Sequence, residues 1–438
     1  MLSLAAAVFA ASVAGSALPP RQATNSPVFF PIKYPYNGYP KVYTDITFGT
    51  PGQTPVQAVV DLGSANFWAY EANASIYYGS TRLGEQGHCI QVPSPAYNVS
   101  ASTTATDETY NPRQYSYGGN SKTITAYDSW NDTLAFTVDG LGSGASFANQ
   151  QIAVSNYSQV RQAATECTGL DYDGAILGVS ENRDDTDGPS FRQNLLDDGL
   201  IASSTLSMWF DQPPAGVQDT FHGSALFGAV PTSKYSGSLT KVTKRQPENS
   251  IGYYVDTPVW SATRIDGSST KPVAIGNYSA ATSTTCLVDS GSGQDYLPIS
   301  EADFLDATGL VSLDNTIAFN GSCEDMPKNG TISLQFAGAE AGTSVTVTIP
   351  LMNYVRGNLD ALSEIENRTM CGLSMTLDSP DCTLGSPFAS GAFMAFNDEL
   401  GEIAFAQGGV STGSLDGSDG LGEVVTIGKG EGLSKVTG

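Results

Sequence analysis

The sequence predicts an all-β fold built from two related halves, and three observations favour it. The 438 residues include 47 glycines and 23 prolines, which imply many turns between short runs rich in Val, Thr, Ile, Tyr and Phe. A chain of this length exceeds what one hydrophobic core usually serves, so two lobes are expected. One short motif with a central aspartate also occurs twice, which indicates an internal repeat.

The charge of the chain limits its partners. With 44 acidic and 20 basic residues the net charge is −24, which would repel nucleic acid and anionic membrane surfaces. The only histidines, His88 and His222, exclude a histidine-rich metal site, and we expect no metal and no cofactor. At about pH 4 half of the carboxylates are protonated and the charge approaches zero. The balance is typical of a protein in an acidic environment, although a charge that serves only solubility explains it equally well.

The first residues predict export. Residues 1–18 are apolar and rich in small residues, as in a secretory signal peptide, and residues 19–27 form a short processed or mobile segment. A membrane anchor is the weaker reading, because no later run reaches the about 18 apolar residues of a spanning helix. We expect a secreted or extracellular protein, with a vacuolar or cell-wall location as alternatives. Eight Asn-x-Ser/Thr triplets fit a glycoprotein, at Asn73, Asn98, Asn131, Asn156, Asn277, Asn320, Asn329 and Asn367.

The six cysteines are even in number, which indicates three disulfides in an oxidising compartment. Fifteen pairings are open to six cysteines, and there is no Cys-x-x-Cys spacing for zinc or redox chemistry. Residues 408–438 begin with a stretch dominated by Gly, Ser and Asp and are predicted to form a mobile tail.

The repeated motif carries the chemistry. Residues 58–64 read Ala-Val-Val-Asp-Leu-Gly-Ser and residues 286–292 read Cys-Leu-Val-Asp-Ser-Gly-Ser. Each is an apolar strand that runs into Asp-x-Gly-Ser, where the glycine permits a tight turn with the aspartate at the strand end. An apolar element that ends in glycine follows each copy, at residues 175–178 and 383–385. A single Asp-x-Gly is usually a surface turn, but two copies in matching contexts favour a functional pair.

Two carboxyl groups within hydrogen-bond distance cannot both ionise, so they share a proton and titrate together. The ionised member can take a proton from water, while the protonated member polarises a carbonyl group and later protonates the leaving nitrogen. Asp61 and Asp289 therefore predict peptide hydrolysis in acid without a covalent intermediate.

These motifs resemble the pepsin-like aspartic protease family, in its fungal, yapsin-like form, from about Val28 to Ala406. Residues 61–68, Asp-Leu-Gly-Ser-Ala-Asn-Phe-Trp, are similar to the first active-site stretch of the family, and residues 172–178, Tyr-Asp-Gly-Ala-Ile-Leu-Gly, to its Asp-Gly-Ile-Leu-Gly element. Residues 223–228 resemble the strand that opens the second lobe, and residues 384–388 resemble the closing motif.

The resemblance implies two β-barrel-like lobes, residues 28–212 and 213–407, on either side of a peptide-binding cleft. It implies a monomeric endopeptidase that acts on polypeptides and binds pepstatin-like inhibitors, with Asp61 and Asp289 as the catalytic pair. Ser64 and Ser292 would hydrogen-bond the two aspartates, and Tyr117 would be the flap tyrosine that packs on Trp68. The remaining supporting residues it implies are Gly63, Gly118, Ser290 and Gly291.

The resemblance also guides the disulfide pairing. Cys323 and Cys371 fall where the family has its second-lobe disulfide. Cys286 and Cys382 each precede a central motif of the second half on strands that should be neighbours, which leaves Cys89 with Cys167.

The sequence departs from the family pattern at several points. Leu62 replaces the usual Thr or Ser, so one of the two hydroxyl groups that would hydrogen-bond the opposite loop is missing. We expect a nearby backbone group to lack its partner, at a cost of about 1–3 kcal/mol if it is buried, and we expect the activity to be lower. The flap reads Tyr-Gly-Gly-Asn-Ser at residues 117–121, and residues 71–110 contain a divergent stretch. Asp295 is an extra acid that either selects basic substrate side chains or is solvated. A basic propeptide before Val28 is absent or reduced to a few residues.

These departures keep a second interpretation open. The chain is either an active endopeptidase or a catalytically weak or inactive binding protein of the same fold, such as an inhibitor of a secreted enzyme or a carbohydrate- or peptide-binding module. Two short helices, near residues 188–199 and 300–309, read as scaffold because each ends in glycine and the second begins with a capping box.

Overall fold

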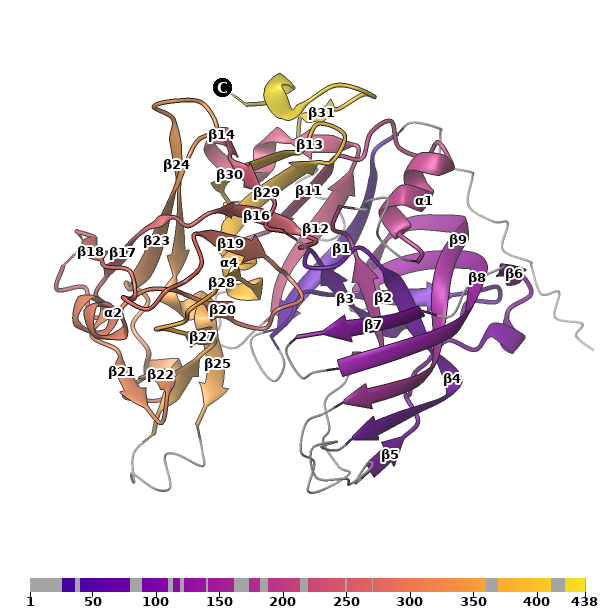
Figure 1. The fold of residues 1–438 in the computed structure, drawn as a ribbon, viewed down its shortest axis with the longest axis horizontal. Coiled ribbons are helices and arrows are strands. Elements are labelled where there is room, and N and C mark those ends of the chain that lie inside the picture. The colour runs from indigo at the N-terminus through magenta and orange to yellow at the C-terminus, as the bar shows by residue number, and fades with distance from the viewer. Residues whose placement is uncertain are drawn as a thin grey trace, which may run out of the picture.

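The computed structural model describes residues 26–35, 40–78, 89–108, 113–118, 122–138, 141–160, 173–181, 188–212, 220–248, 250–269, 271–359, 369–410 and 422–437. In this part of the chain strands dominate and the helices are short, which confirms the predicted all-β class. Figure 1 shows the strands of the N-terminal half (indigo to magenta) on one side and most strands of the C-terminal half (orange) on the other.

The N-terminal half is a strongly curved sheet whose central strands are rich in Val, Ile, Phe and Tyr. Its elements are β1 Val28–Pro35, β2 Tyr43–Phe48, β3 Val56–Asp61, β4 Phe67–Tyr78, β5 Cys89–Gln91, β6 Thr106–Glu108, β7 Arg113–Tyr117, β8 Lys122–Val138, β9 Leu141–Val160, β10 Ala175–Gly178, α1 Phe191–Asp197 and β11 Leu206–Phe210.

In the described residues the C-terminal half contains four smaller sheets, in the orders β15-β16-β19-β28-β20-β27, β18-β17-β23-β24, β21-β22-β26-β25 and β13-β31. Its elements are β12 Thr220–Phe227, β13 Ala229–Pro231, β14 Ser236–Val242, β15 Lys244–Arg245, β16 Tyr253–Asp256, β17 Val259–Thr263, β18 Val273–Ile275, β19 Thr285–Val288, β20 Asp295–Tyr296, α2 Glu301–Thr308, β21 Val311–Leu313, β22 Thr316–Phe319, β23 Thr331–Ala337, β24 Ser344–Pro350, β25 Val355–Asn358, β26 Cys371–Leu373, β27 Met375–Thr376, β28 Cys382–Leu384, α4 Ser386–Gly391, β29 Ala392–Asn397, β30 Glu402–Gln407 and β31 Val424–Thr426.

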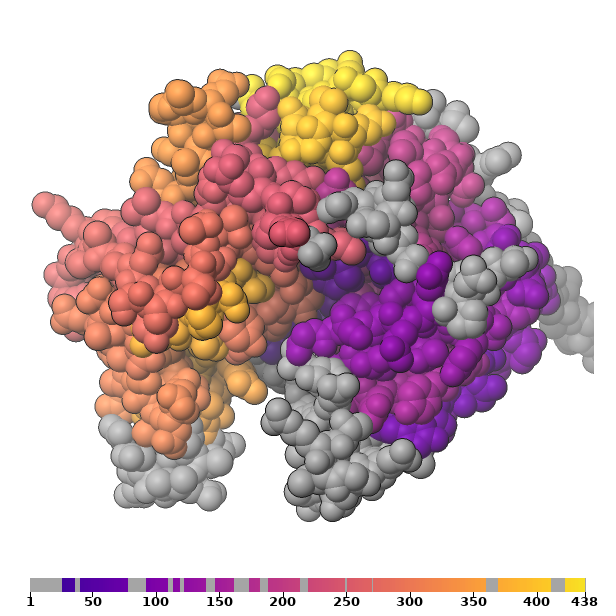
Figure 2. Space-filling view, viewed as in Figure 1, coloured from indigo at the N-terminus to yellow at the C-terminus, as the bar shows by residue number. Residues whose placement is uncertain are grey.

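Strands from both halves share the largest sheet, whose path is β14-β30-β29-β11-β12-β1-β2-β3-β10-β4-β9-β8-β6. β1 pairs antiparallel with β12 along its whole length, and β11 pairs with β29, so the two halves are joined by main-chain hydrogen bonds. Figure 2 shows a furrow between the two halves, with indigo residues of the first strands visible inside it. The boundary at residues 212 and 213 stays a prediction.

Both predicted helices are confirmed. Ser190 caps α1 and Ser300 caps α2, each by accepting a hydrogen bond from the main chain three residues on. Gly309 ends α2 in the left-handed conformation, at φ 77°, which an L side chain rarely adopts.

The predicted mobile tail is wrong for residues 422–437. β31 pairs antiparallel with β13, and the side chains of Ile427 and Leu433 are fully buried. Apolar residues that follow the Gly/Ser/Asp stretch supply this anchor, because burying them removes their surface from water. The predicted leader, residues 1–18, and residues 19–25 lie outside the described residues.

Candidate active site

Two loops of the same construction present Asp61 and Asp289. Asp61 ends β3, which pairs in parallel with β10, and Asp289 follows β19, which pairs in parallel with β28. The main-chain N–H of Val179 donates to the Asp61 carbonyl at 2.8 Å, and the N–H of Asp289 donates to the Leu384 carbonyl at 2.9 Å. The repeat in the sequence is therefore also a repeat in space.

Gly63 and Gly291 bring the backbone of each loop close to both carboxyl groups. The N–H of Gly63 donates to Asp61 Oδ1 at 2.8 Å, and the N–H of Gly291 donates to Asp289 Oδ1 at 2.9 Å. A β-carbon on Gly63 would stand 2.7 Å from Asp289 Oδ1, and one on Gly291 would stand 2.5 Å from Asp61 Oδ1. Glycine is needed at both positions because the opposite aspartate fills the space of a side chain.

The Asp61 and Asp289 carboxyl groups lie within hydrogen-bond distance of each other. Burial raises the pKa of Asp289 well above its ordinary value, and the charge of Asp61 and their mutual hydrogen bond raise it further. The N–H of Gly291 and the charge of Lys41 oppose this rise. The Ser64 hydroxyl donates to Asp61 Oδ2 at 2.5 Å, as predicted. The pair can thus carry one ionised and one protonated carboxyl group side by side.

Ser290 connects the two loops, whereas its counterpart Leu62 packs in the core. The Ser290 hydroxyl accepts the N–H of Leu62 at 3.0 Å and donates to the Val60 carbonyl at 2.6 Å. Leu62 is fully buried in the main hydrophobic cluster. One side of the connection is therefore polar and the other is apolar packing, as the sequence predicts.

The second loop has an additional brace that the sequence did not reveal. The Ser386 hydroxyl, at the start of α4, lies within hydrogen-bond distance of the carbonyls of Ser290 (2.9 Å) and Ser292 (3.0 Å). The Ser292 hydroxyl donates to the Gln294 carbonyl at 2.7 Å, so its predicted bond to Asp289 is wrong. Ser292 stabilises the shape of its own loop instead.

The predicted aromatic pair lies next to Asp61. Trp68 Nε1 donates to the Tyr117 hydroxyl at 2.8 Å, and Tyr117 is also hydrogen-bonded to Ser64. Burial, followed by the charge of Asp61, raises the pKa of Tyr117, so its hydroxyl stays protonated. Gly118 is exposed, and no atom lies within 4 Å of the place that a β-carbon would take. Hydrogen bonds thus run from the indole through Tyr117 and Ser64 to Asp61.

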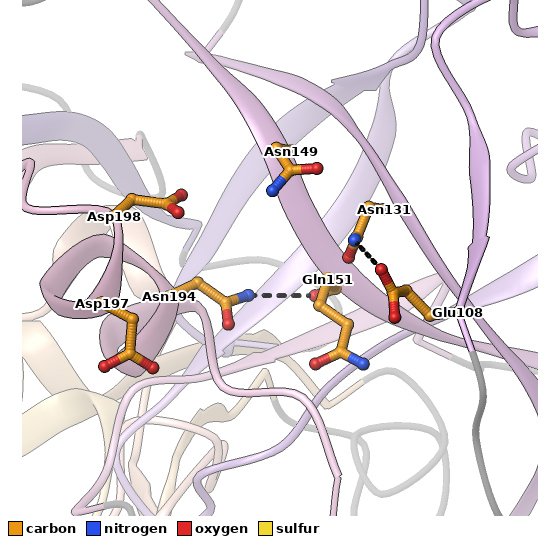
Figure 3. Close-up of a pocket in the computed structure, with 7 residues that line it drawn as sticks. All are labelled: Glu108, Asn131, Asn149, Gln151, Asn194, Asp197 and Asp198. Atoms are coloured by element: carbon orange, nitrogen blue, oxygen red, sulfur yellow. Dashed lines mark hydrogen bonds between the residues drawn. The ribbon is translucent and has the colours of Figure 1, made fainter.

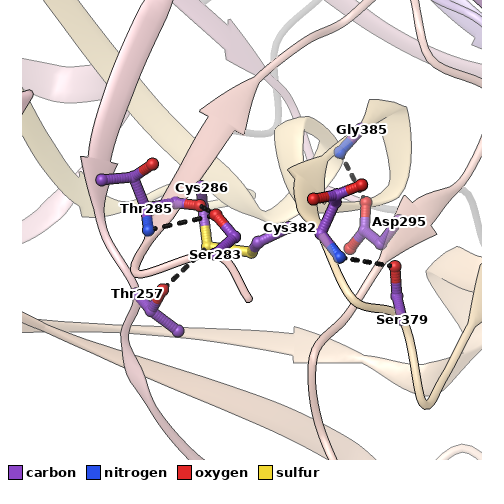
Figure 4. Close-up of a disulfide and its surroundings, with 9 residues drawn as sticks. Thr257, Ser283, Thr285, Cys286, Asp295, Ser379, Cys382 and Gly385 are labelled. Atoms are coloured by element: carbon purple, nitrogen blue, oxygen red, sulfur yellow. Dashed lines mark hydrogen bonds between the residues drawn. A yellow bond between two sulfur atoms is a disulfide. The ribbon is translucent and has the colours of Figure 1, made fainter. Parts of the chain in front are cut away.

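Asp295 is neither a substrate-facing nor a solvated acid, so both predictions for it are wrong. Its side chain is fully buried, and its oxygens accept the N–H of Gly385 at 2.7 Å, the N–H of Phe388 at 3.4 Å and the Tyr354 hydroxyl at 2.8 Å. Figure 4 shows the hydrogen bond from Gly385. Burial raises the pKa of Asp295 to about 7 despite these three donors. The side chain points inward from β20 and ties it to the start of α4.

Comparison with protein families matches residues 41–408 to a family described as eukaryotic aspartyl protease. The chain belongs to this family. It is 23% identical to barrierpepsin of Saccharomyces cerevisiae over 83% of this chain and 59% of that protein. It is 27% identical to the probable aspartic-type endopeptidase opsB of Aspergillus fumigatus, over 83% of this chain and 68% of the relative. It is 25% identical to secreted aspartic protease 8 of Candida albicans, over 86% of this chain and 78% of the relative.

This aspartyl protease contains two of the predicted disulfides. Cys286 pairs with Cys382, with Cα atoms 4.5 Å apart, and Cys323 pairs with Cys371, at 4.8 Å. The first disulfide joins β19 to β28 three residues before Asp289 (Figure 4). The predicted bond from Cys89 to Cys167 lies outside the described side chains and stays a prediction.

The predicted glycosylation sites fall into two groups. Asn131 and Asn156 lie in β8 and β9, and their amide nitrogens donate to Glu108 (2.5 Å) and Glu71 (2.6 Å). Figure 3 shows Asn131 and Glu108 in a polar hollow of about 200 Å³ beside α1. Asn367 lies outside the described residues. Exposed side chains form the second group, at Asn73, Asn98, Asn277, Asn320 and Asn329.

Sequence reasoning missed a cluster of charged side chains next to the aspartates. Lys41 and Lys122 both bind Asp173, and no motif signalled this because the three residues come from separate segments. Within the described segments, no group of three or more His, Cys, Asp or Glu residues is arranged to hold a metal ion. No helix in these segments is long and apolar enough to cross a membrane.

Proposed function

We propose that this aspartyl protease is an active endopeptidase that hydrolyses polypeptides in acid, with Asp61 and Asp289 as its catalytic pair. The observation that carries the proposal is the shared hydrogen bond between two carboxyl groups on symmetric loops, with the pKa of Asp289 raised. A pair that holds one proton supplies a base and an acid at the same position.

In the proposed reaction, the ionised carboxylate accepts a proton from a water molecule as the water oxygen bonds to the peptide carbonyl carbon. The protonated carboxyl group hydrogen-bonds the carbonyl oxygen, where negative charge develops. The tetrahedral intermediate then collapses, the C–N bond breaks, and the nitrogen receives the proton of the protonated carboxyl group, while the proton taken from water stays on the other. The products are a carboxylic acid and an amine, and the pair regains its shared proton.

Further residues are proposed to support this step. Ser64 orients Asp61, and Tyr117 with Gly118 covers the substrate from the flap. Trp68 holds the Tyr117 hydroxyl in place. Ser290 and the two loop glycines keep the carboxyl groups in register, which catalysis requires to within about half an ångström.

The proposal extends to location and partners. The apolar residues 1–18, the exposed triplets and the name of the Candida relative support a secreted, glycosylated protein. We expect a monomer that pepstatin-like inhibitors block.

A second candidate is a weak or inactive binding protein of the same fold. Leu62 favours it, because a buried leucine replaces one hydroxyl of the grip between the loops. The intact bonds of Ser290 and the brace from Ser386 weigh against complete loss of geometry.

The test is cleavage of an unfolded protein substrate at about pH 4, with and without pepstatin. Active enzyme should show pepstatin-sensitive cleavage that Asp289→Asn abolishes while thermal unfolding is retained. Absence of cleavage by folded, glycosylated protein refutes the proposal. If Leu62→Thr then creates activity, the second candidate is supported.

A further inference from the structure

Lys41, Asp173 and Lys122 form a buried ion cluster. Lys122 Nζ lies 2.7 Å from Asp173 Oδ2, and Lys41 Nζ lies 3.0 Å from both oxygens of Asp173. The side chains of Lys122 and Asp173 are 1% and 5% exposed, and that of Lys41 is 19% exposed. Buried lysine is rare unless it is paired, and loss of one partner leaves an uncompensated charge. The cluster is therefore a fixed feature rather than a chance surface contact.

Lys122 connects this cluster to the flap. It is the first residue of β8 and stands opposite Tyr117 in the β7–β8 register. Its Nζ lies 5.9 Å from the centre of the Trp68 ring, a distance at which the ring attracts a cation. One side chain thus lies beside the indole that holds the Tyr117 hydroxyl and occupies the last paired position before the turn of the hairpin that carries Tyr117.

Lys41 connects the same cluster to the second aspartate loop. The N–H of Val42 donates to the Ser290 carbonyl at 3.3 Å. A β-carbon on Gly293 would meet Pro40 at 3.6 Å and Lys41 at 3.8 Å, so this segment lies against the loop. The cluster contains two cations and one anion, and the charge of Lys41 acts on Asp289.

We propose that Lys122, held by Asp173, is a positioning residue for the flap, and that Lys41 couples the same cluster to the second aspartate loop. Lys122 sets the place of Trp68 and thereby of Tyr117 over the aspartates, without contact to substrate. This inference rests on the proposed function. Among the charged and titratable groups of the neighbouring described segments, Lys41 acts on Asp289, and Asp61 and Asp173 act on Tyr117.

The main variant is Lys122→Met, which removes the charge and keeps most of the side-chain volume. Lys234→Met is the matched control, because Lys234 is 5% exposed, lies 3.9 Å from Asp211 and also stands 5.9 Å from a tryptophan ring, that of Trp209. We expect Lys122→Met to lower kcat/KM by at least about tenfold, because small displacements of the groups around the reacting atoms slow catalysis. Lys234→Met should change kcat/KM by less than about twofold.

A double-mutant cycle tests whether Lys122 acts through Asp173. If it does, Asp173→Asn added to Lys122→Met should cost much less in kcat/KM than Asp173→Asn alone. Additive losses would overturn the coupling. Lys41→Met should move the acid limb of the kcat/KM profile to higher pH, because removing a nearby cation makes the pair harder to ionise. If the acid limb of the kcat/KM profile does not move, Lys41 does not couple the cluster to the second aspartate loop.

Exchange of the Trp68 indole proton, followed by NMR, gives a readout that does not need activity. Lys122→Met should speed this exchange by at least about tenfold, because its hydrogen bond to Tyr117 loosens, and Lys234→Met should leave it unchanged. If the wild type cleaves substrate but neither kcat/KM nor exchange responds to Lys122→Met, the positioning inference fails alone. If exchange responds and the wild type cleaves nothing, the proposed function fails and the positioning stands.

Discussion

Asp295→Asn should remove a pH-dependent loss of stability. In the folded chain burial raises the pKa of this carboxyl group to about 7, against an ordinary value of 3.8. Between these values the folded state holds a proton that the unfolded state has released, so stability falls as the pH rises. A shift of about three units corresponds to about 4 kcal/mol, which is fully lost only above the folded pKa.

The substitution suits the site because asparagine imitates the protonated acid. Its oxygen can accept the N–H groups of Gly385 and Phe388, and its NH₂ group can donate to the Tyr354 hydroxyl oxygen. The free energy of unfolding should therefore change little at about pH 4, while at about pH 8 the variant should be more stable than the wild type by up to about 4 kcal/mol.

Urea unfolding of both proteins at the two pH values measures this difference, and every other titrating group cancels between them. Asp381→Asn, at an exposed position next to Cys382, is the control and should show no such divergence. If Asp295→Asn destabilises the protein at least as much at about pH 8 as at about pH 4, the three donors hold the carboxylate ionised and the reasoning from burial is refuted.

Three other outcomes are expected. Gly291→Ala should lower kcat by at least about 100-fold, because its β-carbon would stand 2.5 Å from Asp61 Oδ1. Gly293→Ala in the same loop is the control, because its β-carbon would meet only ordinary contacts. Steady-state kinetics compare the two variants, and equal losses of kcat would contradict the steric argument. Arg192→Met should cost about 3–5 kcal/mol in urea unfolding, because Arg192 is 2% exposed and lies 3.0 Å from Asp398, whose side chain is 14% exposed; a cost below about 1 kcal/mol would count against it. After enzymatic deglycosylation in H₂¹⁸O, mass spectrometry should find more ¹⁸O label at the exposed sites than at Asn131 and Asn156, and the reverse order would contradict the grouping. The exposed sites are Asn73, Asn98, Asn277, Asn320 and Asn329.

The sequence was sufficient where local residues determine the geometry. Asp-x-Gly-Ser at 61–64 and 289–292 predicted both loops, because a strand end and a glycine turn are local features. The capping box at Ser300 predicted the start of the second helix for the same reason. The pairing of Cys286 with Cys382 followed from two strands that each precede a central motif, and β19 and β28 are indeed neighbours.

The sequence was insufficient where a side chain is defined by distant partners. Asp295 looked like a substrate-facing or solvated acid, but the inward face of β20 buries it against Tyr354 and Gly385. Ser292 was expected to hydrogen-bond Asp289, but its hydroxyl donates to the Gln294 carbonyl in its own loop. Neither outcome has a local signal, because strand direction and side-chain face are decided by tertiary packing.

The interior also sharpens the meaning of the acidic composition. Asp173 has two lysines, so this buried carboxylate is compensated at neutral pH. Asp289 and Asp295 are raised in pKa chiefly by burial, and the donors to Asp295 are neutral groups. Acid protonates these two groups and removes the cost of burying their charge. The net charge of −24 alone is equally consistent with simple solubility, whereas these two buried acids favour an acidic working environment.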